Sequence, residues 1–326
     1  MSYNPTSIQY YELDNFTFQN GDSLPLRLAY REFNVDSKKT ALIPTCFRGR
    51  INTTLNFVTG ALRDYRVIVV ALLGNGESSS PSNMANFPST LDYQDCVRAQ
   101  HRLITEHLSI PALDVIVGFS MGGQCAYHWA AMYPEMVQRA VVICSSARTS
   151  LHNRQFLEGP KAALVHSVDY NSSSSIQNGQ PPLRGLHAFG RAYSAWLTSA
   201  EWFEERLFEK QGFNSLAEWA EVVGGKNYED WHPDDLLALL GMWQRSDIGR
   251  GVTLESALRR LKARILLMPC RTDQYFKWEA SKKEAELLQY GELAVIPSVW
   301  GHIAGGGSND EDNEWMDRQI RLFLSK

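Results

Sequence analysis

The chain has 326 residues, a formal net charge of -4, a sequence pI near 6.1 and a mean hydropathy of -0.29. A slightly acidic chain offers no basic stripe for a phosphate backbone, so nucleic acid is not an expected partner. No apolar stretch reaches the length that spans a bilayer, and residues 1–5 lack a charged segment followed by an apolar run. We therefore expect a cytoplasmic protein with no membrane partner.

The cysteines also fit the expectation of a cytoplasmic protein. None of the five cysteines forms a C-x-x-C pair or a metal-ligand spacing, and most lie in segments that read as core elements. They stand at Cys46, Cys96, Cys125, Cys144 and Cys270. We expect buried thiols rather than disulfides, and we predict no metal site.

The first half of the chain alternates strand and helix patterns. Residues 11–18 and 26–33 predict a hairpin-like pair of strands, because their connection carries Asn20-Gly21. Residues 67–72 predict a buried strand, and residues 91–108 place apolar side chains at helical spacing. The run at 113–117, which ends in the β-branched residues Val115, Ile116 and Val117, predicts a strand that is buried on both faces.

Directly after that strand stands Gly118-Phe119-Ser120-Met121-Gly122, a Gly-x-Ser-x-Gly sequence, followed by a helical pattern over residues 121–132. Strand, motif and helix arrive in the order of a nucleophile elbow, in which a sharp turn exposes the serine hydroxyl at the edge of a sheet. The positive end of the helix then faces the site where oxyanion charge develops during acyl transfer. This segment predicts Ser120 as a nucleophile.

The second half adds strands at 139–144, 264–269 and 292–297 and a helix over 278–288. The alternation predicts an α/β fold with a mostly parallel central sheet and helices on both faces. Between the sixth and seventh strands, residues 150–250 form a helical, aromatic insertion that holds five of the nine tryptophans. We predict a core of residues 1–149 and 251–326 and a helical cap of residues 150–250, in which most tryptophans pack between the cap's own helices.

An elbow needs a base, which in this architecture comes from a loop after the last strand. Of the eight histidines, only His302 has that position, because it follows the strand pattern at 292–297 and precedes a run of glycines. The acid comes between serine and histidine in the chain. Asp273 is the first carboxylate after the strand at 264–269, and the alternative segment at 144–152 contains no acidic residue. The other reading of Asp273 is a cap for the next helix.

In the expected chemistry, Ser120 attacks a carbonyl, His302 takes its proton, and Asp273 holds the imidazole tautomer. Two backbone amides should stabilise the oxyanion. One is that of Met121, and the other comes from the loop after the strand near residue 41. Phe47 is the first choice for that second amide and Cys46 the alternative, with Cys46 also expected at the substrate.

Together these residues resemble the homoserine O-acetyltransferase family of the α/β-hydrolase superfamily over nearly the whole chain. The resemblance rests on Val117-Gly118-Phe119-Ser120-Met121-Gly122-Gly123, on Ser145-Ser146-Ala147-Arg148, and more weakly on Gly190-Arg191 and on residues 243–248 in the cap. It implies the α/β-hydrolase fold, a contact between Arg191 and the substrate, and a homodimer formed partly through cap helices.

Two departures from that family bear on the substrate. Ile303 follows the histidine where the family has an aspartate, and Thr198 stands where a tyrosine is expected. An apolar side chain cannot pair with the ammonium of homoserine, and losing a charged contact costs about 2 to 5 kcal/mol. We therefore do not expect a homoserine acetyltransferase.

The expected function is a serine hydrolase that acts on an ester or related small-molecule acyl substrate, suggested to be a specialised metabolite, without a cofactor. The first alternative is an O-acyltransferase that moves an acetyl group from acetyl-CoA to an alcohol other than homoserine, since the same triad serves both reactions. The alternative of another class is a non-hydrolytic binding module on the same fold. Its usual sign would be a missing triad member.

Overall fold

The computed structural model describes residues 7–171 and 180–326, so the leaderless N-terminus expected from residues 1–5 lies outside the described part. The strands are β1 (Gln9–Thr17), β2 (Ser23–Phe33), β3 (Lys39–Pro44), β4 (Tyr65–Val70), β5 (Val115–Phe119), β6 (Arg139–Ile143), β7 (Arg264–Met268) and β8 (Gly291–Leu293). The helices are α1 (Tyr93–Arg102), α2 (Met121–Met132), α3 (Leu151–Val165), α4 (Leu183–Ser194), α5 (Ala200–Glu204), α6 (Leu216–Val223), α7 (Pro233–Arg245), α8 (Leu254–Arg259), α9 (Trp278–Leu287) and α10 (Asp310–Leu324). Shorter helical turns are η2 (Ile51–Thr53), η3 (Leu103–His107), η4 (Lys226–Tyr228) and η5 (Gly301–Gly306).

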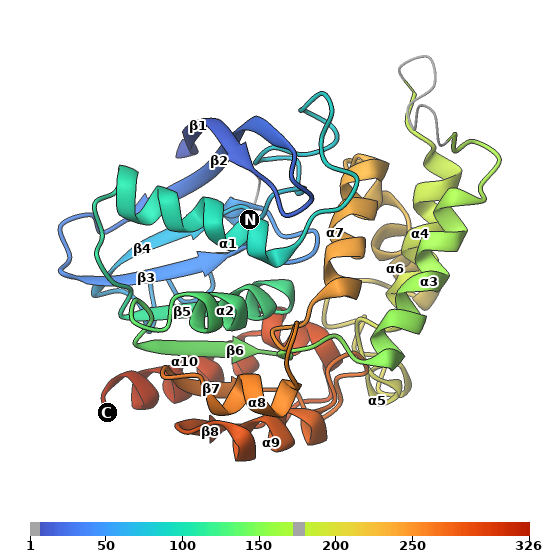
Figure 1. Ribbon diagram of the computed structural model, residues 1–326. Coiled ribbons are helices and arrows are strands. Elements are labelled where there is room, and N and C mark those ends of the chain that lie inside the picture. Colours follow the sequence, from blue (N-terminus) through green and yellow to red (C-terminus); the bar gives the residue numbers. More distant parts are fainter. Residues whose placement is uncertain (1–6, 172–179) are drawn as a thin grey trace.

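The eight strands form one sheet in the order β1-β2-β4-β3-β5-β6-β7-β8. The pairs β1·β2 and β2·β4 are antiparallel, and every pair from β4 to β8 is parallel. This confirms the fold class and the antiparallel pair expected at the N-terminus. Because the strands from β3 to β8 run the same way, the loops that follow them gather at one edge of the sheet (Figure 1).

Helices cover both faces of the sheet. On one face, α1, α2, α8 and α9 share a core with side chains of the strands, and Trp129 and Cys125 of α2 lie fully buried there. On the other face, α10 packs through Met316, Ile320 and Phe323 together with the segment around η2. Both strand faces are therefore buried, which is why β4, β5 and β7 read as continuous apolar runs.

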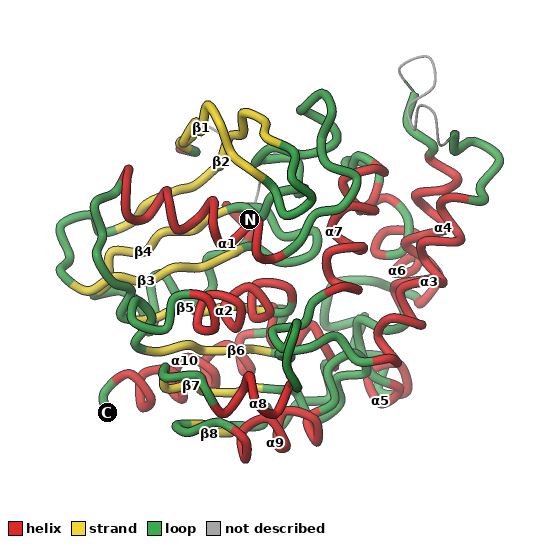
Figure 2. Tube along the Cα trace, viewed as in Figure 1, coloured by secondary structure: helices red, strands yellow, loops and turns green. Residues whose placement is uncertain are grey.

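The helices α3 to α7 follow β6 and stand together beyond the carboxyl ends of the parallel strands (Figures 1 and 2). Within this group, Trp202 and Trp219 pack with Leu207 and Phe208 in a separate apolar cluster. Trp243 instead contacts residues of the core near the strand ends. The limits of the cap at 150 and 250 stay a prediction.

The structure differs from the expected elements in two places. Regular pairing of the last strand ends at Leu293, and only Ile296 of the remaining stretch makes an isolated bridge, to Cys270. The helix expected over 91–108 ends as a regular α-helix at Arg102 and continues as the wider turn η3.

All five cysteines are free thiols, and four of them are buried. None of the described helices is long and apolar enough to cross a membrane.

Candidate active site

The turn between β5 and α2 holds Ser120 in a strained backbone conformation, with φ 54° and ψ -122°. Two glycines permit it. A Cβ on Gly118 would lie 2.1 Å from the carbonyl oxygen of Gly122, and one on Gly122 would lie 2.6 Å from that of Pro44. The Ser120 amide donates to the Ile143 carbonyl at 2.9 Å, which ties the turn to β6. This is the geometry of a nucleophile elbow.

A continuous chain of hydrogen bonds joins the three residues expected to form the triad. Ser120 Oγ lies 2.9 Å from His302 Nε2, and His302 Nδ1 lies 2.8 Å from Asp273 Oδ2. All three are buried, at 3%, 4% and 1% exposure respectively. A carboxylate only accepts, so Nδ1 carries the proton and Nε2 is free to accept from the serine hydroxyl.

The backbone around Asp273 fixes its carboxylate. Asp273 Oδ1 accepts from the amides of Tyr275 at 2.7 Å and Phe276 at 3.1 Å, so the residue also orders its own loop. Thr272 Oγ1 donates to the Ser298 carbonyl at 3.0 Å and accepts from the Gly301 amide at 3.1 Å. The loops after β7 and β8 are therefore bonded to each other, which sets the position of Asp273 relative to His302.

Aromatic rings surround the imidazole of His302. Ring centroids of Phe119, Tyr275 and Phe276 lie 4.8, 4.6 and 5.6 Å from it. Trp243, from α7, stacks on Phe276 at 5.8 Å. These rings exclude water from the imidazole, which strengthens every electrostatic interaction there. Sequence reasoning did not single them out, although Tyr275 and Phe276 lie only two and three residues after the acid.

The residues expected at the oxyanion come from two segments of the chain, the start of α2 and the loop after β3. Met121 is the first residue of α2, and Phe47 and Cys46 lie in the loop after β3. Phe47 is buried against Tyr193 and Trp243, with centroids 5.4 and 6.0 Å away. Burial raises the pKa of the Cys46 thiol to about 11, so this side chain is a neutral thiol near neutral pH.

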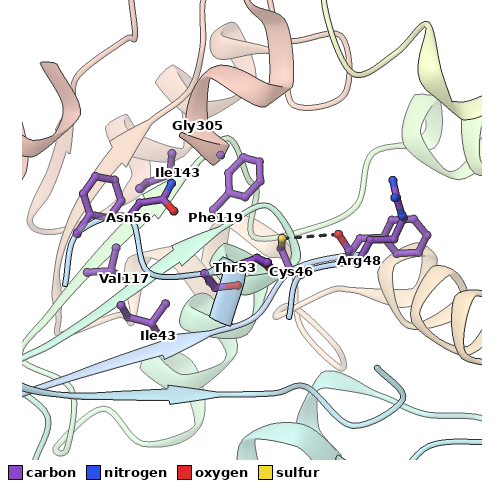
Figure 3. Close-up of a pocket in the computed structure, with 14 residues that line it drawn as sticks. Ile43, Cys46, Arg48, Thr53, Asn56, Val117, Phe119, Ile143 and Gly305 are labelled. Carbon is purple, nitrogen blue, oxygen red and sulfur yellow. Dashed lines mark hydrogen bonds between the residues drawn. The ribbon is translucent and has the colours of Figure 1, made fainter. Parts of the chain in front are cut away.

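A small cavity with a volume of about 190 Å³ lies next to Cys46 and Phe47 (Figure 3). Its apolar wall consists of Ile43, Val117, Ile143 and Phe119, which come from β3, β5 and β6. Cys46, Phe47, Gly305 and Gly306 complete the side next to the catalytic loops. The labelled apolar side chains point toward the same space in Figure 3, whereas Arg48 extends away from it.

Arg191 is not brought to this centre. Its side chain is 59% exposed, and its guanidinium pairs with Glu221 of α6 at 2.9 Å. The residues of α4 that face Phe47 are instead Phe189 and Tyr193. Thr198 is fully buried and packs against Gly301, while Ile303 is half-buried and donates its amide to the Leu197 carbonyl.

One group among the described residues has the spacing of metal ligands, namely Cys144, Asp273 and His302, whose ligand atoms lie within 4.8 Å of one another. Asp273 and His302 are already bonded to each other. Burial raises the pKa of the Cys144 thiol well above its usual value, so it is a neutral thiol rather than the thiolate that metals bind.

A buried Ser-His-Asp chain on a strand-turn-helix elbow defines the class of protein, which is that of the serine hydrolases. The chain belongs to the α/β-hydrolase fold family, whose sequence pattern it matches over residues 55–304. This confirms the fold class and the enzymatic reading.

Three similar proteins place it more finely. An ethyl acetate hydrolase of Pseudomonas veronii is 30% identical over 313 residues, which are 90% of this chain and 87% of the relative. The structure of the acetyl esterase MekB has a TM-score of 0.90 and 28% identity, covering 98% of this chain and 97% of the other. A homoserine O-acetyltransferase of Pasteurella multocida is 26% identical, covering 74% of this chain and 69% of the relative. The resemblance to the acetyltransferase family is thus confirmed, alongside a likeness to esterases.

Proposed function

We propose that this protein is an esterase that hydrolyses esters of short carboxylic acids through an acyl-enzyme on Ser120. The observation that carries the proposal is the buried chain from Ser120 Oγ through His302 to Asp273, with distances of 2.9 and 2.8 Å. The names of the two similar proteins, an ethyl acetate hydrolase and an acetyl esterase, support the substrate class.

In the proposed mechanism, Ser120 Oγ attacks the ester carbonyl while His302 Nε2 takes its proton. The amides of Met121 and Phe47, or Cys46 as the alternative, donate to the oxyanion. His302 then protonates the leaving alkoxide, and an acyl-serine remains. Water attacks this acyl group, His302 takes the water proton and returns it to Ser120 Oγ, and the carboxylic acid leaves. Asp273 stabilises the imidazolium in both halves.

The cavity of about 190 Å³ beside Phe47 and Phe119 supports a short acyl group. It lies below the usual 300 to about 1,000 Å³ of pockets for drug-sized ligands, so it suits a few carbon atoms only. Cys46 lines it as a neutral thiol, which agrees with a contact to an apolar acyl chain rather than with a second nucleophile. In this proposal, the alcohol half of the ester contacts aromatic residues of the predicted cap.

A second candidate is transfer of an acetyl group from acetyl-CoA to an alcohol, and the likeness to homoserine O-acetyltransferases favours it. Homoserine itself is a poor acceptor in this proposal, because Ile303 offers no partner for an ammonium and Arg191 is engaged with Glu221 at the surface. For the esterase reading, in contrast, we propose a specialised metabolite as the ester substrate.

Intact-protein mass spectrometry separates the two reactions. The wild type and Ser120→Ala are incubated briefly with p-nitrophenyl acetate and, separately, with acetyl-CoA, with and without added alcohols. An acetyl adduct on the wild type that water clears supports the esterase, and one that persists until an alcohol arrives supports the transferase. An adduct of equal size on Ser120→Ala, or none on either protein, contradicts both.

We extend the proposal to the cofactor requirement, the location and the oligomeric state of the enzyme. We propose that it works without a cofactor in the cytoplasm, and that it is a homodimer, as the resemblance to the acetyltransferase family implies. Dialysis against a chelator that leaves hydrolysis unchanged tests the first point. Light scattering coupled to a sizing column tests the dimer, which requires about twice the 36.9 kDa of one chain.

A further inference from the structure

A second and larger cavity lies between the start of α3, α8 and α9, with a volume of about 620 Å³. Its lining is mostly apolar and shares no residue with the cavity beside Phe119. Tyr275 and Phe276 form one wall. The same two residues contact His302, so the loop between β7 and α9 that carries Asp273, the acid loop, separates this cavity from the proposed catalytic centre. Its volume is within the range that holds small organic ligands.

One buried polar side chain in the lining, that of Asn153, has no hydrogen-bond partner among the described residues. Asn153 is 1% exposed, and neither its Nδ2 nor its Oδ1 makes a hydrogen bond with any residue that the structure describes. Its backbone amide already bonds to Ser150 Oγ, the helix cap, so the side chain is not needed there. Leaving a buried amide unpaired costs about 1 to 3 kcal/mol, which a ligand with a hydrogen-bond acceptor would recover.

The charges around the cavity favour an anion. Lys277 and Lys283 both line it, both are exposed, and neither makes an ion pair within the described part of the chain. Arg148 and Glu255 are already paired, with Asp247 and Arg259.

The one buried acid in the lining is Glu284. Its two carboxylate oxygens accept from Tyr127 and from the Ala147 amide, at 2.7 and 3.0 Å. It is therefore turned toward the protein, and the unpaired charges that remain at the cavity are positive.

We propose that this cavity is a second, non-catalytic binding site for a medium-chain carboxylate. The apolar chain packs on Leu258, Tyr275 and Phe276, the Asn153 amide donates to the carboxylate, and Lys277 and Lys283 attract its charge. The site uses none of the triad residues, so it stands independently of the proposed esterase activity.

Calorimetric titration of the full chain with decanoate tests the proposal. The wild type is compared with Asn153→Leu, with the double variant Lys277→Gln/Lys283→Gln, and with Lys282→Gln, an exposed neighbour that does not line the cavity. We expect both site variants to bind about tenfold more weakly, a loss of about 1.4 kcal/mol, and Lys282→Gln to bind like the wild type. Decanol, which lacks the charge, is expected to bind more weakly than decanoate.

Thermal melting shows whether each variant is folded. Asn153→Leu is expected to melt no lower than the wild type, because it removes an unpaired buried amide. If it does unfold, Leu258→Trp fills the cavity from another side and must also abolish binding. Equal affinity of the wild type and a folded site variant, or no binding to the wild type, overturns the proposal. Hydrolysis of p-nitrophenyl acetate by the same samples reports separately on the esterase.

Discussion

The acid loop and helix α9 lie between two regions of the molecule. These regions differ in whether their buried polar groups make hydrogen bonds. On one side, Asp273 accepts from His302 and from two backbone amides. On the other side, Asn153 has no partner among the described residues, and burial raises the pKa of Glu284 to about 7 despite its bonds to Tyr127 and Ala147. The polar groups of the first region are pre-organised for proton transfer. The second region contains a buried amide without a hydrogen-bond partner, as an unfilled binding site does.

The largest effect is expected on the triad side, for Asp273→Asn. An amide at this position presents a donor to His302 Nδ1 and forces the other tautomer, so kcat for p-nitrophenyl acetate should fall about 10⁴-fold. Asp235→Asn is the matched control, because Asp235 is also buried and bonded, to Ser82, but lies on α7 away from the triad. A loss of less than tenfold for Asp273→Asn would remove this residue from the proposed mechanism.

The elbow itself is tested by Gly118→Ala. The new Cβ would lie 2.1 Å from the Gly122 carbonyl oxygen, so backbone must move, and unfolding free energy should drop by about 3 kcal/mol or more. Gly159→Ala is the control, because its Cβ would meet nothing within 4 Å beyond its chain neighbours and the backbone of its own helix α3. The helix propensity of alanine and its position before Pro160 act in opposite directions, so the free energy of unfolding should change by less than about 1 kcal/mol. Urea unfolding measures both, and similar values for the two variants would argue against a strained elbow.

On the cavity side, Glu284→Gln should change how stability depends on pH. The folded-state pKa of Glu284 is raised from 4.5 to about 7, so the native state holds a proton that the unfolded state has lost between these values. Stability from this group is greatest below pH 4.5 and falls as pH rises through 7, by about 3 kcal/mol.

Urea unfolding at pH 5 and pH 8 therefore checks the effect as a difference. We take the free energy of unfolding of Glu284→Gln minus that of the wild type. This difference should be about 3 kcal/mol larger at pH 8 than at pH 5. The comparison cancels opposite contributions such as that of buried His128, whose pKa is lowered to about 4. Glu286→Gln, an exposed site on the same helix, is the control and should show no such difference. Parallel pH curves for the wild type and Glu284→Gln would contradict the raised pKa.

The smallest effect is expected for Arg191→Ala. An ion pair between two side chains that are 59% and 46% exposed contributes about 0 to 1 kcal/mol, and kcat/KM should stay within about threefold. Arg206→Ala removes a similar exposed pair with Glu209, between α5 and α6, and serves as its match. If Arg191→Ala alone lowers kcat/KM more than tenfold, Arg191 reaches the substrate as the family resemblance implies.

Most of the sheet was predictable because both faces of the strands are buried. Continuous apolar runs marked β4, β5 and β7, and the predicted helix over 121–132 agrees with α2. The last strand was predicted too long, because residues 294–297 are apolar without pairing regularly. Apolarity reports burial, and only the position of a neighbouring strand decides whether the backbone joins the ladder.

The sequence by itself determined the nucleophile motif and its candidate partners, since the elbow fixes Ser120 locally and the chain order of the fold leaves one histidine and one aspartate in suitable loops. Only the tertiary structure decided which rings enclose His302, that Arg191 lies at the surface, and that Asn153 is buried without a partner. The physical reason is that a turn is set by neighbours in the chain, whereas a cavity is set by side chains that meet from distant helices.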